Sequence, residues 1–260
     1  MKTLIHKTAI VSPDAAVHES VSVGPGAIIE PDVRIGAGSK IGPYAIIRQY
    51  TRMGEGNTVD AHAVIGGKPQ HAAFDGSETA LNIGDNNVFR EYVTINRAFM
   101  PGAETRIGSN CFVMAYAHVG HDCVVGDNVT ITNNVSLAGH VEIGRNAVMA
   151  GYAGAHQFTR VGRYCMVASY TKLTKDALPF MMIGGTPPRH FRLNKVGLNR
   201  NGIDGDRYSA LEAAFRALRS GDRLLEAVPD TEDVRHLREW MAAESKFGSF
   251  GFLTAKKAKS

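Results

Sequence analysis

The sequence is poor in cysteine and lacks any long hydrophobic run. Its 260 residues include three cysteines, Cys111, Cys123 and Cys165. An odd number of thiols does not indicate a disulfide framework, and we expect all three to be buried as small apolar side chains. No stretch approaches the roughly 18 apolar residues of a transmembrane helix, and the N-terminal residues hold no signal-peptide core. These absences predict a cytoplasmic protein without stable membrane insertion.

The sequence also lacks a strong charge of one sign, because 29 basic and 25 acidic residues give a formal net charge of +4. The surplus lies in residues 189–260, with 14 basic and 10 acidic groups, whereas residues 1–188 hold 15 of each. A P-loop and a dinucleotide fingerprint are absent. The basic C-terminal part lacks the interleaved aromatics of a single-strand nucleic-acid surface, so no nucleic-acid partner is expected. It is either a solvated helical surface or a dock for an acidic protein.

A six-residue repeat runs through about two-thirds of the chain. Apolar residues recur at every sixth position from Val11 to Ile65, from Ile83 to Ile95 and from Ile107 to Leu173. The fifth position of most hexads is small or β-branched, as at Ala27 and Val33. A period of six matches neither a helix nor sustained two-residue alternation. It predicts short strands on the three flat faces of a triangular coil, with 18 residues in each turn.

Stacked coils of this kind bury one continuous apolar column and pair their strands in parallel. Glycine often follows the apolar residue, as at Gly42, Gly126 and Gly162, and suits a corner that needs a positive φ or a close backbone approach. The pattern resembles the hexapeptide-repeat acyltransferases, whose prism is a left-handed parallel β-helix. The resemblance therefore implies an all-β prism of that hand.

Two segments interrupt the repeat, residues 66–82 and 96–106, and we expect them to form loops that project from the prism. The prism itself is predicted for residues 1–188. Loops on a rigid scaffold often carry function, although tolerated surface insertions are an equally simple explanation.

Residues 189–260 are predicted to form a C-terminal helical module that packs on the open end of the prism. Asp206 is a candidate cap for a helix that Gly221 ends, and Thr231 is a candidate cap for the next one. Arginines gather in this part of the chain. Three of these arginines form a candidate docking surface for an acidic partner protein: Arg216, Arg219 and Arg223.

Four histidines gather late in the repeat, at His118, His121, His140 and His156. Because 18 residues make one coil, His140 should lie one coil beyond His121 and nearly in line with it. All four face outward, which suits a cleft between subunits of a self-associating prism. The imidazole pKa lies near physiological pH, so histidine suits removal of a proton from a sugar hydroxyl that attacks a thioester. Asp122 is a candidate partner for His121, although neighbours on a strand point apart and another carboxylate is equally possible.

The runs AHVGHDCVVGDNVTITNNVSLAGHVEIG, GAHQF and NKVGLNRNG closely resemble the corresponding stretches of the UDP-N-acetylglucosamine O-acyltransferases. This family begins lipid A synthesis, and the resemblance covers essentially the whole chain. It implies a homotrimer that moves a 3-hydroxyacyl chain from acyl carrier protein to the glucosamine 3-hydroxyl of UDP-N-acetylglucosamine. It implies neither a metal nor an organic cofactor.

The resemblance also implies roles for individual residues. His121 would be the general base beside Asp122, and the backbone N–H of Gly139 would stabilise the oxyanion of the tetrahedral intermediate. Ser169 stands where a glycine admits long acyl chains, which predicts a chain that is not among the longest. The residues implied to contact or orient the nucleotide sugar are His71, His118, His140, His156, Gln157, Asn194 and Arg200.

The sequence departs from the family pattern at several of its recognition positions. His71 and Ala73 stand where the first loop usually presents an acidic residue and a lysine, and Asn96 replaces a histidine. Val196 and Asn201 replace a glutamate and an arginine at the nucleotide end. These departures keep open a paralogue that acylates another nucleotide sugar, including one acylated at an amine.

Two further alternatives remain. Hexapeptide prisms also carry zinc in the γ-type carbonic anhydrases, and His118, His121 and His140 would supply three ligands of the right kind. A non-catalytic trimeric scaffold would leave the histidine column unexplained.

Overall fold

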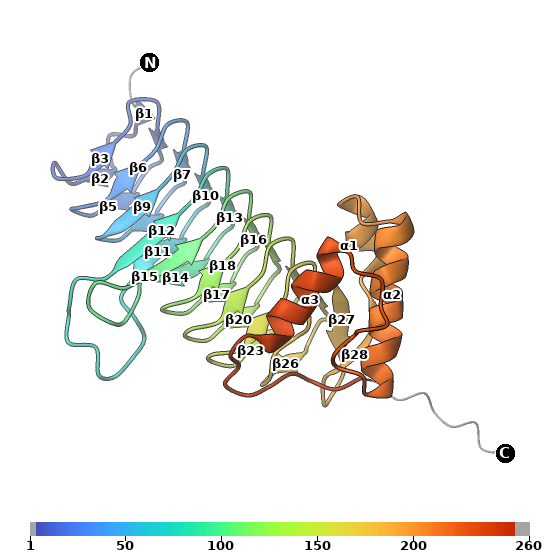
Figure 1. The fold of residues 1–260 in the computed structure, drawn as a ribbon. Helices are drawn as coiled ribbons and strands as arrows, with labels where there is room; N and C mark the ends of the chain where they lie inside the picture. Colours follow the sequence, from blue (N-terminus) through green and yellow to red (C-terminus); the bar gives the residue numbers. More distant parts are fainter. Residues whose placement is uncertain (1–3, 253–260) are drawn as a thin grey trace.

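The computed structural model describes residues 4–252, and these form a triangular prism with three helices at its C-terminal end (Figure 1). The chain passes over three faces in turn, and each face is a sheet of short strands. Face A consists of β1 (Leu4–Ile5), β4 (Ser22–Val23), β7 (Lys40–Ile41), β10 (Thr58–Val59), β13 (Val88–Phe89), β16 (Phe112–Val113), β19 (Thr130–Ile131), β22 (Val148–Met149), β25 (Met166–Val167), β27 (Met181–Gly184) and β28 (Arg189–Leu193).

The other two faces have the same construction. Face B consists of β2 (Ile10–Val11), β5 (Ile28–Ile29), β8 (Ile46–Ile47), β11 (Val64–Gly67), β14 (Thr94–Asn96), β17 (His118–Val119), β20 (Ser136–Leu137), β23 (Gly154–Ala155) and β26 (Lys172–Leu173). Face C consists of β3 (Ala16–Val17), β6 (Arg34–Ile35), β9 (Thr51–Met53), β12 (Ala80–Ile83), β15 (Glu104–Ile107), β18 (Val124–Val125), β21 (Glu142–Ile143) and β24 (Arg160–Val161).

The strand register confirms the predicted coil of 18 residues. His118 pairs with Ser136, Ser136 with Gly154, and Gly154 with Lys172, all in parallel strands. Only β27 and β28 pair antiparallel among the named strands. Residues separated by 18 therefore lie directly above one another on a face, wherever no loop intervenes.

The core of the prism is the column of inward residues that the repeat predicts. Ile29, Ile47 and Ile65 are each at most 1 % exposed, and the small Ala27 and Ala45 fill the space beside them. Close packing of this column supplies the main hydrophobic stabilisation of a chain whose strands are mostly two residues long. The cysteines also lie in this core, and all three are free thiols, as expected.

The corners show why glycine follows so many apolar residues. A Cβ on Gly42 would lie 2.8 Å from the Val59 carbonyl oxygen, and one on Gly126 would lie 2.8 Å from the Arg145 nitrogen. Close approach of the next coil therefore requires these glycines. Positive φ falls two residues later instead, for example at Tyr44 with 55° and Asn128 with 57°.

The projecting loops lie where the sequence loses its repeat. One follows β11 and ends at β12, and the other follows β14 and ends at β15. Both loops leave the same corner, between faces B and C, and they extend away from the prism in Figure 1.

Three helices follow β28: α1 (Lys195–Arg200), α2 (Gly205–Ser220) and α3 (Glu232–Ala242). Thr231 caps α3 by accepting a hydrogen bond from the Val234 amide, and Gly221 ends α2 with φ of 102°, as predicted. The predicted cap at Asp206 is wrong, because α2 begins earlier and its N-cap is Asp204. Asp206 lies inside the first turn, where its charge favours the helix dipole.

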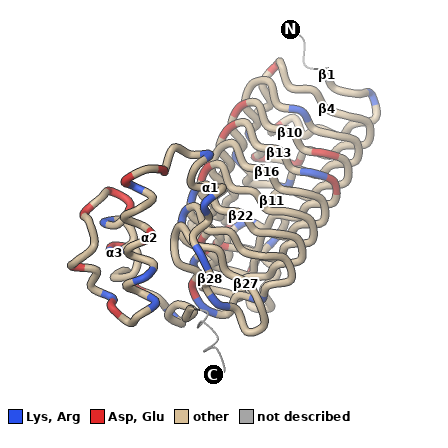
Figure 2. The backbone as a smooth tube through the Cα atoms, turned by 90° about the vertical axis from the view of Figure 1, so that its right-hand side faces the viewer, with Lys and Arg blue, Asp and Glu red and all other residues tan. Residues whose placement is uncertain are grey.

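The helices pack on the end of the prism around a second apolar cluster that includes Phe180, Leu211 and Leu237. The fully buried Asp233 on α3 accepts hydrogen bonds from Arg163 of the prism and Arg207 of α2. Basic residues recur along β28, α1 and α2 (Figure 2). Within residues 4–252, no helix has both the length and the apolar character required to cross a membrane.

Candidate active site

A groove of about 540 Å³ lies along face B, beside the corner that carries the loops. Its floor is the outward column of His118, Ser136, Gly154 and Lys172, which the parallel register places one above another. The remaining lining residues are Gln70, His71, Asn96, Gly120, His121, Leu137, Ala138, Gly139, Ala155, His156 and Gln157.

His121 and Asp122 form a hydrogen-bonded pair at the edge of this groove. His121 Nδ1 lies 2.6 Å from Asp122 Oδ2, and the two side chains are 12 % and 10 % exposed. The expectation that adjacent side chains point apart holds for a strand, but these residues lie in the turn after β17. Asp122 has φ of 59°, which brings its carboxylate back toward the His121 ring. Asp122 is therefore the carboxylate that orients His121.

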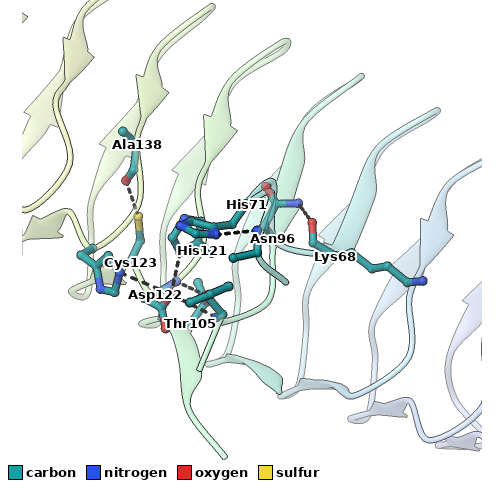
Figure 3. A network of polar contacts seen from close by, with 11 residues as sticks. Lys68, His71, Asn96, Thr105, His121, Asp122, Cys123 and Ala138 are labelled. Atoms are coloured by element: carbon teal, nitrogen blue, oxygen red, sulfur yellow. Dashed lines mark hydrogen bonds and ion pairs between the residues drawn. The ribbon is translucent and has the colours of Figure 1, made fainter. Parts of the chain in front are cut away.

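The second loop and β15 hold Asp122 in this position. The Phe99 amide donates a hydrogen bond of 3.0 Å to Asp122 Oδ2. The Asp122 amide donates to Oγ1 of the fully buried Thr105, at 2.8 Å (Figure 3). Phe99 lies in a loop without the repeat, and the repeat marks Thr105 only as an inward residue, so neither contact with Asp122 was predictable from the sequence.

The first loop brings an additional imidazole to the site. The His71 ring centroid lies 5.7 Å from that of His121 and 4.1 Å from that of Phe99 (Figure 3). His71 Nδ1 accepts a hydrogen bond from the Ala73 amide. The structure thus places His71 in the groove, whereas Ala73 has no polar side chain to offer.

Gly139 lies directly beside the His121 ring, one coil further on. A Cβ at Gly139 would lie 2.6 Å from Cε1 and 2.7 Å from Nε2 of that ring, so only glycine fits here. In the described part of the chain, the Gly139 N–H has no hydrogen-bond acceptor. An unused backbone donor beside a histidine is the arrangement that stabilises a developing oxyanion.

The remaining histidines differ in their surroundings. His118 Nδ1 lies 2.8 Å from Thr94 Oγ1, and burial lowers its pKa, with a further contribution from His121. His140 stacks on Phe158 with a centroid distance of 4.5 Å. Burial lowers the pKa of His140, while Asp122 opposes this effect. His156 is exposed and lines the groove with Gln157.

Asn194 and Arg200 lie away from His121. They line a separate cavity of about 580 Å³ on the face A side, together with Met166, Met182 and Tyr208. The Asn194 side chain caps α1, since it accepts from the Gly197 amide and donates to the Tyr164 carbonyl. Within one chain the predicted sugar and uridine contacts are therefore not brought together.

Ser169 lies on the corner between faces A and B, next to Tyr170, and its side chain is exposed. Two of the residues that differ from the family pattern, Val196 and Asn201, lie near the face A cavity. Val196 lines that cavity with 61 % exposure, and Asn201 ends α1 by donating to the Gly197 carbonyl.

One group of three ligating side chains within residues 4–252 has atoms close enough to share a metal ion: His121, Asp122 and His140. His118, which the zinc alternative required, is not part of this group. Its Nδ1 is already engaged by Thr94.

Four polar lining residues of the groove were not among the predicted site residues: Gln70, Asn96, Ser136 and Lys172. Lys172 ends the outward column, and nothing but its place in the hexad could have drawn attention to it. Asn96 Nδ2 donates to the Lys68 carbonyl, whereas the buried Asn96 Oδ1 has no hydrogen-bond partner. The replacement of a family histidine did mark Asn96, but not its position in the groove.

Known proteins match both the repeat and the C-terminal part. The model for the bacterial transferase hexapeptide matches residues 14–49 and 104–139, and that for UDP-N-acetylglucosamine O-acyltransferase, domain 2, matches residues 176–249. An acyl-carrier-protein–UDP-N-acetylglucosamine O-acyltransferase of Alkalilimnicola ehrlichii is 45% identical over 253 residues, 94% of this chain and 98% of that protein. This chain belongs to the UDP-N-acetylglucosamine O-acyltransferase family.

Solved structures of the family agree with this assignment. The UDP-N-acetylglucosamine O-acyltransferase of Moraxella catarrhalis is 36% identical, with a TM-score of 0.91 over 95% of this chain and 99% of that one. The enzyme of Bacteroides fragilis is 33% identical, with a TM-score of 0.90 over 94% and 99%. The prism is accordingly the left-handed parallel β-helix of this family, with a small helical part at its C-terminal end.

Proposed function

We propose that this protein transfers a 3-hydroxyacyl chain from acyl carrier protein to the glucosamine 3-hydroxyl of UDP-N-acetylglucosamine, the first step of lipid A synthesis. The observation that carries the proposal is the His121–Asp122 pair at the edge of a groove, with the free Gly139 N–H beside it. Membership of the family supports the choice of substrates.

In the proposed reaction His121 acts as the general base. Its Nδ1–H donates to Asp122, so Nε2 carries the lone pair that accepts the proton of the sugar 3-hydroxyl. The hydroxyl oxygen attacks the thioester carbonyl carbon, and the resulting oxyanion accepts a hydrogen bond from Gly139. The C–S bond then breaks, and the imidazolium returns its proton to the departing thiolate. Asp122 stabilises the imidazolium between these two steps.

The nucleotide sugar is expected to occupy the rest of the groove. His71, His118, His156 and Gln157 line it, and we assign these groups to contacts with the sugar and its phosphates. His140 adjoins the groove and contacts Asp122, and we assign it an orienting role.

We further propose that the active unit is a homotrimer whose sites are completed between subunits. Asn194 and Arg200 lie on the face A side, whereas His121 lies beside face B, so one chain cannot present both to a single nucleotide sugar. If face B of one subunit packs against face A of the next, the missing uridine contacts are supplied across the boundary. A closed ring of three such contacts leaves no face A or face B unpaired.

An aromatic column on the corner between faces A and B supports this arrangement. Tyr44, His62, Tyr92 and Tyr116 stack in series, with centroid distances of 5.0 to 5.3 Å. Tyr116 is nevertheless 58 % exposed in the single chain. Packing of face A against face B would bring three such corners to one axis and bury these rings, which removes apolar surface from water.

For the acyl donor we propose docking on the C-terminal helices. Arg216, Arg219 and Arg223 are exposed, and the first of them pairs with a glutamate only one helical turn away. Arg223 also borders an apolar cavity of about 490 Å³ that Trp240 helps to line. A basic rim around an apolar hollow suits an acidic carrier protein. Charge reversal of the three arginines should raise the KM of the donor and leave that of the acceptor unchanged.

A second candidate function is N-acylation of a 3-amino nucleotide sugar. The observation that favours it is the altered recognition part of the site: His71 and Asn96 line the groove and, with Ala73 in the first loop, stand where the family usually carries other residues. The same base serves either acceptor, because His121 can take the proton of a 3-hydroxyl during its attack or that of a 3-amino group after its attack. The protein should therefore be incubated with UDP-N-acetylglucosamine and with its 3-amino analogue, each with a set of hydroxyacyl carrier proteins.

Ester product with the wild type and none with His121→Ala would support the main proposal. Amide product alone would reassign the acceptor, and product formation that survives His121→Ala would overturn the role of the base. We also propose a cytoplasmic location, because carrier-bound acyl chains and nucleotide sugars are substrates of that compartment.

A further inference from the structure

Three side chains around the catalytic corner lie close enough together to hold a metal ion, although the proposed reaction uses no metal. They are His121, Asp122 and His140, and one nitrogen or oxygen atom of each lies within 4.8 Å of the others. The set comes from two adjacent coils, because His140 follows β20 and the other two follow β17. Two imidazoles and one carboxylate are the ligand types that zinc-like ions prefer.

The distances fit a small ion after modest shifts. Asp122 Oδ2 lies 2.6 Å from His121 Nδ1 and 3.7 Å from His140 Nε2. A tetrahedral ion with bonds of about 2.0–2.2 Å needs its ligand atoms roughly 3.3 Å apart. The His121–Asp122 distance must therefore increase, and the His140–Asp122 distance must decrease, by less than about 1 Å each. Rotation of these partly exposed side chains can supply both changes.

The geometry points to a divalent transition-metal site at His121, Asp122 and His140 whose occupation inhibits the enzyme. The ion binds the lone pair of His121 Nδ1, and the single proton of the neutral ring moves to Nε2, so this ring releases no net proton. Nε2 is the atom that has to accept the proton of the acceptor hydroxyl. The bound ion thus removes both the base and its hydrogen bond to Asp122. The inhibitory part rests on the proposed function, whereas the binding site does not.

Two features of the surroundings bear on affinity. Asp122 Oδ2 accepts from the Phe99 amide and from His121, so an ion that replaces the hydrogen bond to His121 leaves this oxygen with two partners. Lys246 approaches from the C-terminal segment, where its ammonium lies 3.5 Å from the Phe158 ring centroid, and Phe158 stacks on His140. This cation repels a metal ion, although solvent screens it. His71 faces the pair from the first loop, and His118 is a further titratable neighbour of His121.

The test uses the full-length protein without substrate. Co²⁺ is titrated into it and its visible d–d absorption is recorded, and Zn²⁺ binding is measured calorimetrically in two buffers of different ionisation enthalpy. We expect one ion per subunit, a four- or five-coordinate Co²⁺ spectrum and, because the imidazoles bind in their neutral form, no net proton release. His140→Asn and Asp122→Asn should weaken binding by more than about 100-fold, since even outer-sphere changes cost 10–100-fold. Asn is chosen at position 140 because it tolerates the φ of 60° found there.

Two controls sharpen the result. His156→Gln changes a groove histidine outside the cluster and should leave metal affinity unaltered, whereas Lys246→Gln should tighten binding a few-fold. A Co²⁺ spectrum that His140→Asn leaves unchanged, in a variant that unfolds like the wild type, would overturn the site. Acyl transfer unaffected by saturating Zn²⁺ would overturn the inhibition. Binding without transfer to any acceptor would instead remove the proposed function and leave the metal site in place.

Discussion

His121 Nδ1 and Asp122 Oδ2 lie 2.6 Å apart although the two residues are consecutive in the chain. The turn after β17 makes this possible, because Asp122 adopts φ of 59° and directs its carboxylate backward. The hydrogen bond fixes the tautomer of His121 and leaves Nε2 free on the groove side. It is also one of the three links that hold Asp122 between the loops and the prism.

Asp122→Asn should lower kcat by about 10²-fold or more, because an amide no longer stabilises the imidazolium and favours the wrong tautomer. The KM for the nucleotide sugar should change little. Steady-state kinetics of the purified variant check this. A kcat close to the wild-type value would exclude Asp122 from the mechanism.

Thr105→Val should lower kcat by roughly 10-fold without a matching change in KM. The Asp122 amide loses the Oγ1 acceptor it has in a fully buried setting, at a cost of about 1–3 kcal/mol, and the carboxylate shifts. Thr105→Ser keeps the oxygen and should restore most of the activity. Equal kinetics for the two variants would show that Thr105 serves packing alone.

Gly139→Ala should reduce kcat by about 10²-fold, because its Cβ would lie 2.6 Å from the His121 ring and push it out of line. Gly151→Ala is a matched control, since Gly151 has the same place in the turn of the next coil on face A. The nearest atom to its Cβ would be the Asn133 carbonyl oxygen at 3.7 Å. Kinetics and thermal unfolding should show loss of activity only in the first variant.

His190 should make the protein less stable in acid. Burial lowers its pKa to about 4, while Nε2 accepts from the Leu178 amide and Nδ1 contacts the Phe250 carbonyl. The folded pKa lies below the unfolded value of 6.5, so the unfolded chain binds the proton first. The contribution of neutral His190 to the free energy of unfolding is complete above about pH 6.5. It declines as the pH falls toward 4, by roughly 3 kcal/mol in all.

Urea unfolding at about pH 7.5 and about pH 5 measures this difference. His190→Leu should be less stable at the higher pH, because it leaves two backbone groups unpaired, but its stability should depend less on pH within this window. An unchanged pH dependence in the variant would assign the effect to other groups.

Ser169→Gly should lengthen the preferred acyl chain of the donor, because the family resemblance puts a glycine at this position in enzymes that accept long chains. Competition between hydroxyacyl carrier proteins of different chain length checks this with wild type and variant. The same preference in both would separate Ser169 from chain-length selection.

The sequence alone determined the periodic part of the molecule. A repeat of six with an apolar residue in each hexad permits only one way to bury a continuous column, so the faces, the register of 18 and the inward residues such as Ile47 and Ile131 follow from it. The outward column that contains His118 follows from the same arithmetic. The helix caps at Thr231 and Gly221 are local signals and were equally readable.

Only the tertiary structure decided the features that the six-residue repeat does not specify, namely the loop contacts, the His121–Asp122 hydrogen bond and the position of Asn194. The loops lack the repeat, so nothing in the sequence placed Phe99 on Asp122 or His71 beside His121. The bond within the His121–Asp122 pair depends on one backbone dihedral in a turn, which spacing does not specify. The separation of Asn194 from the groove depends on how α1 packs against face A. Contacts between segments that share no common repeat are set by packing in three dimensions, and the periodicity of the sequence carries no information about them.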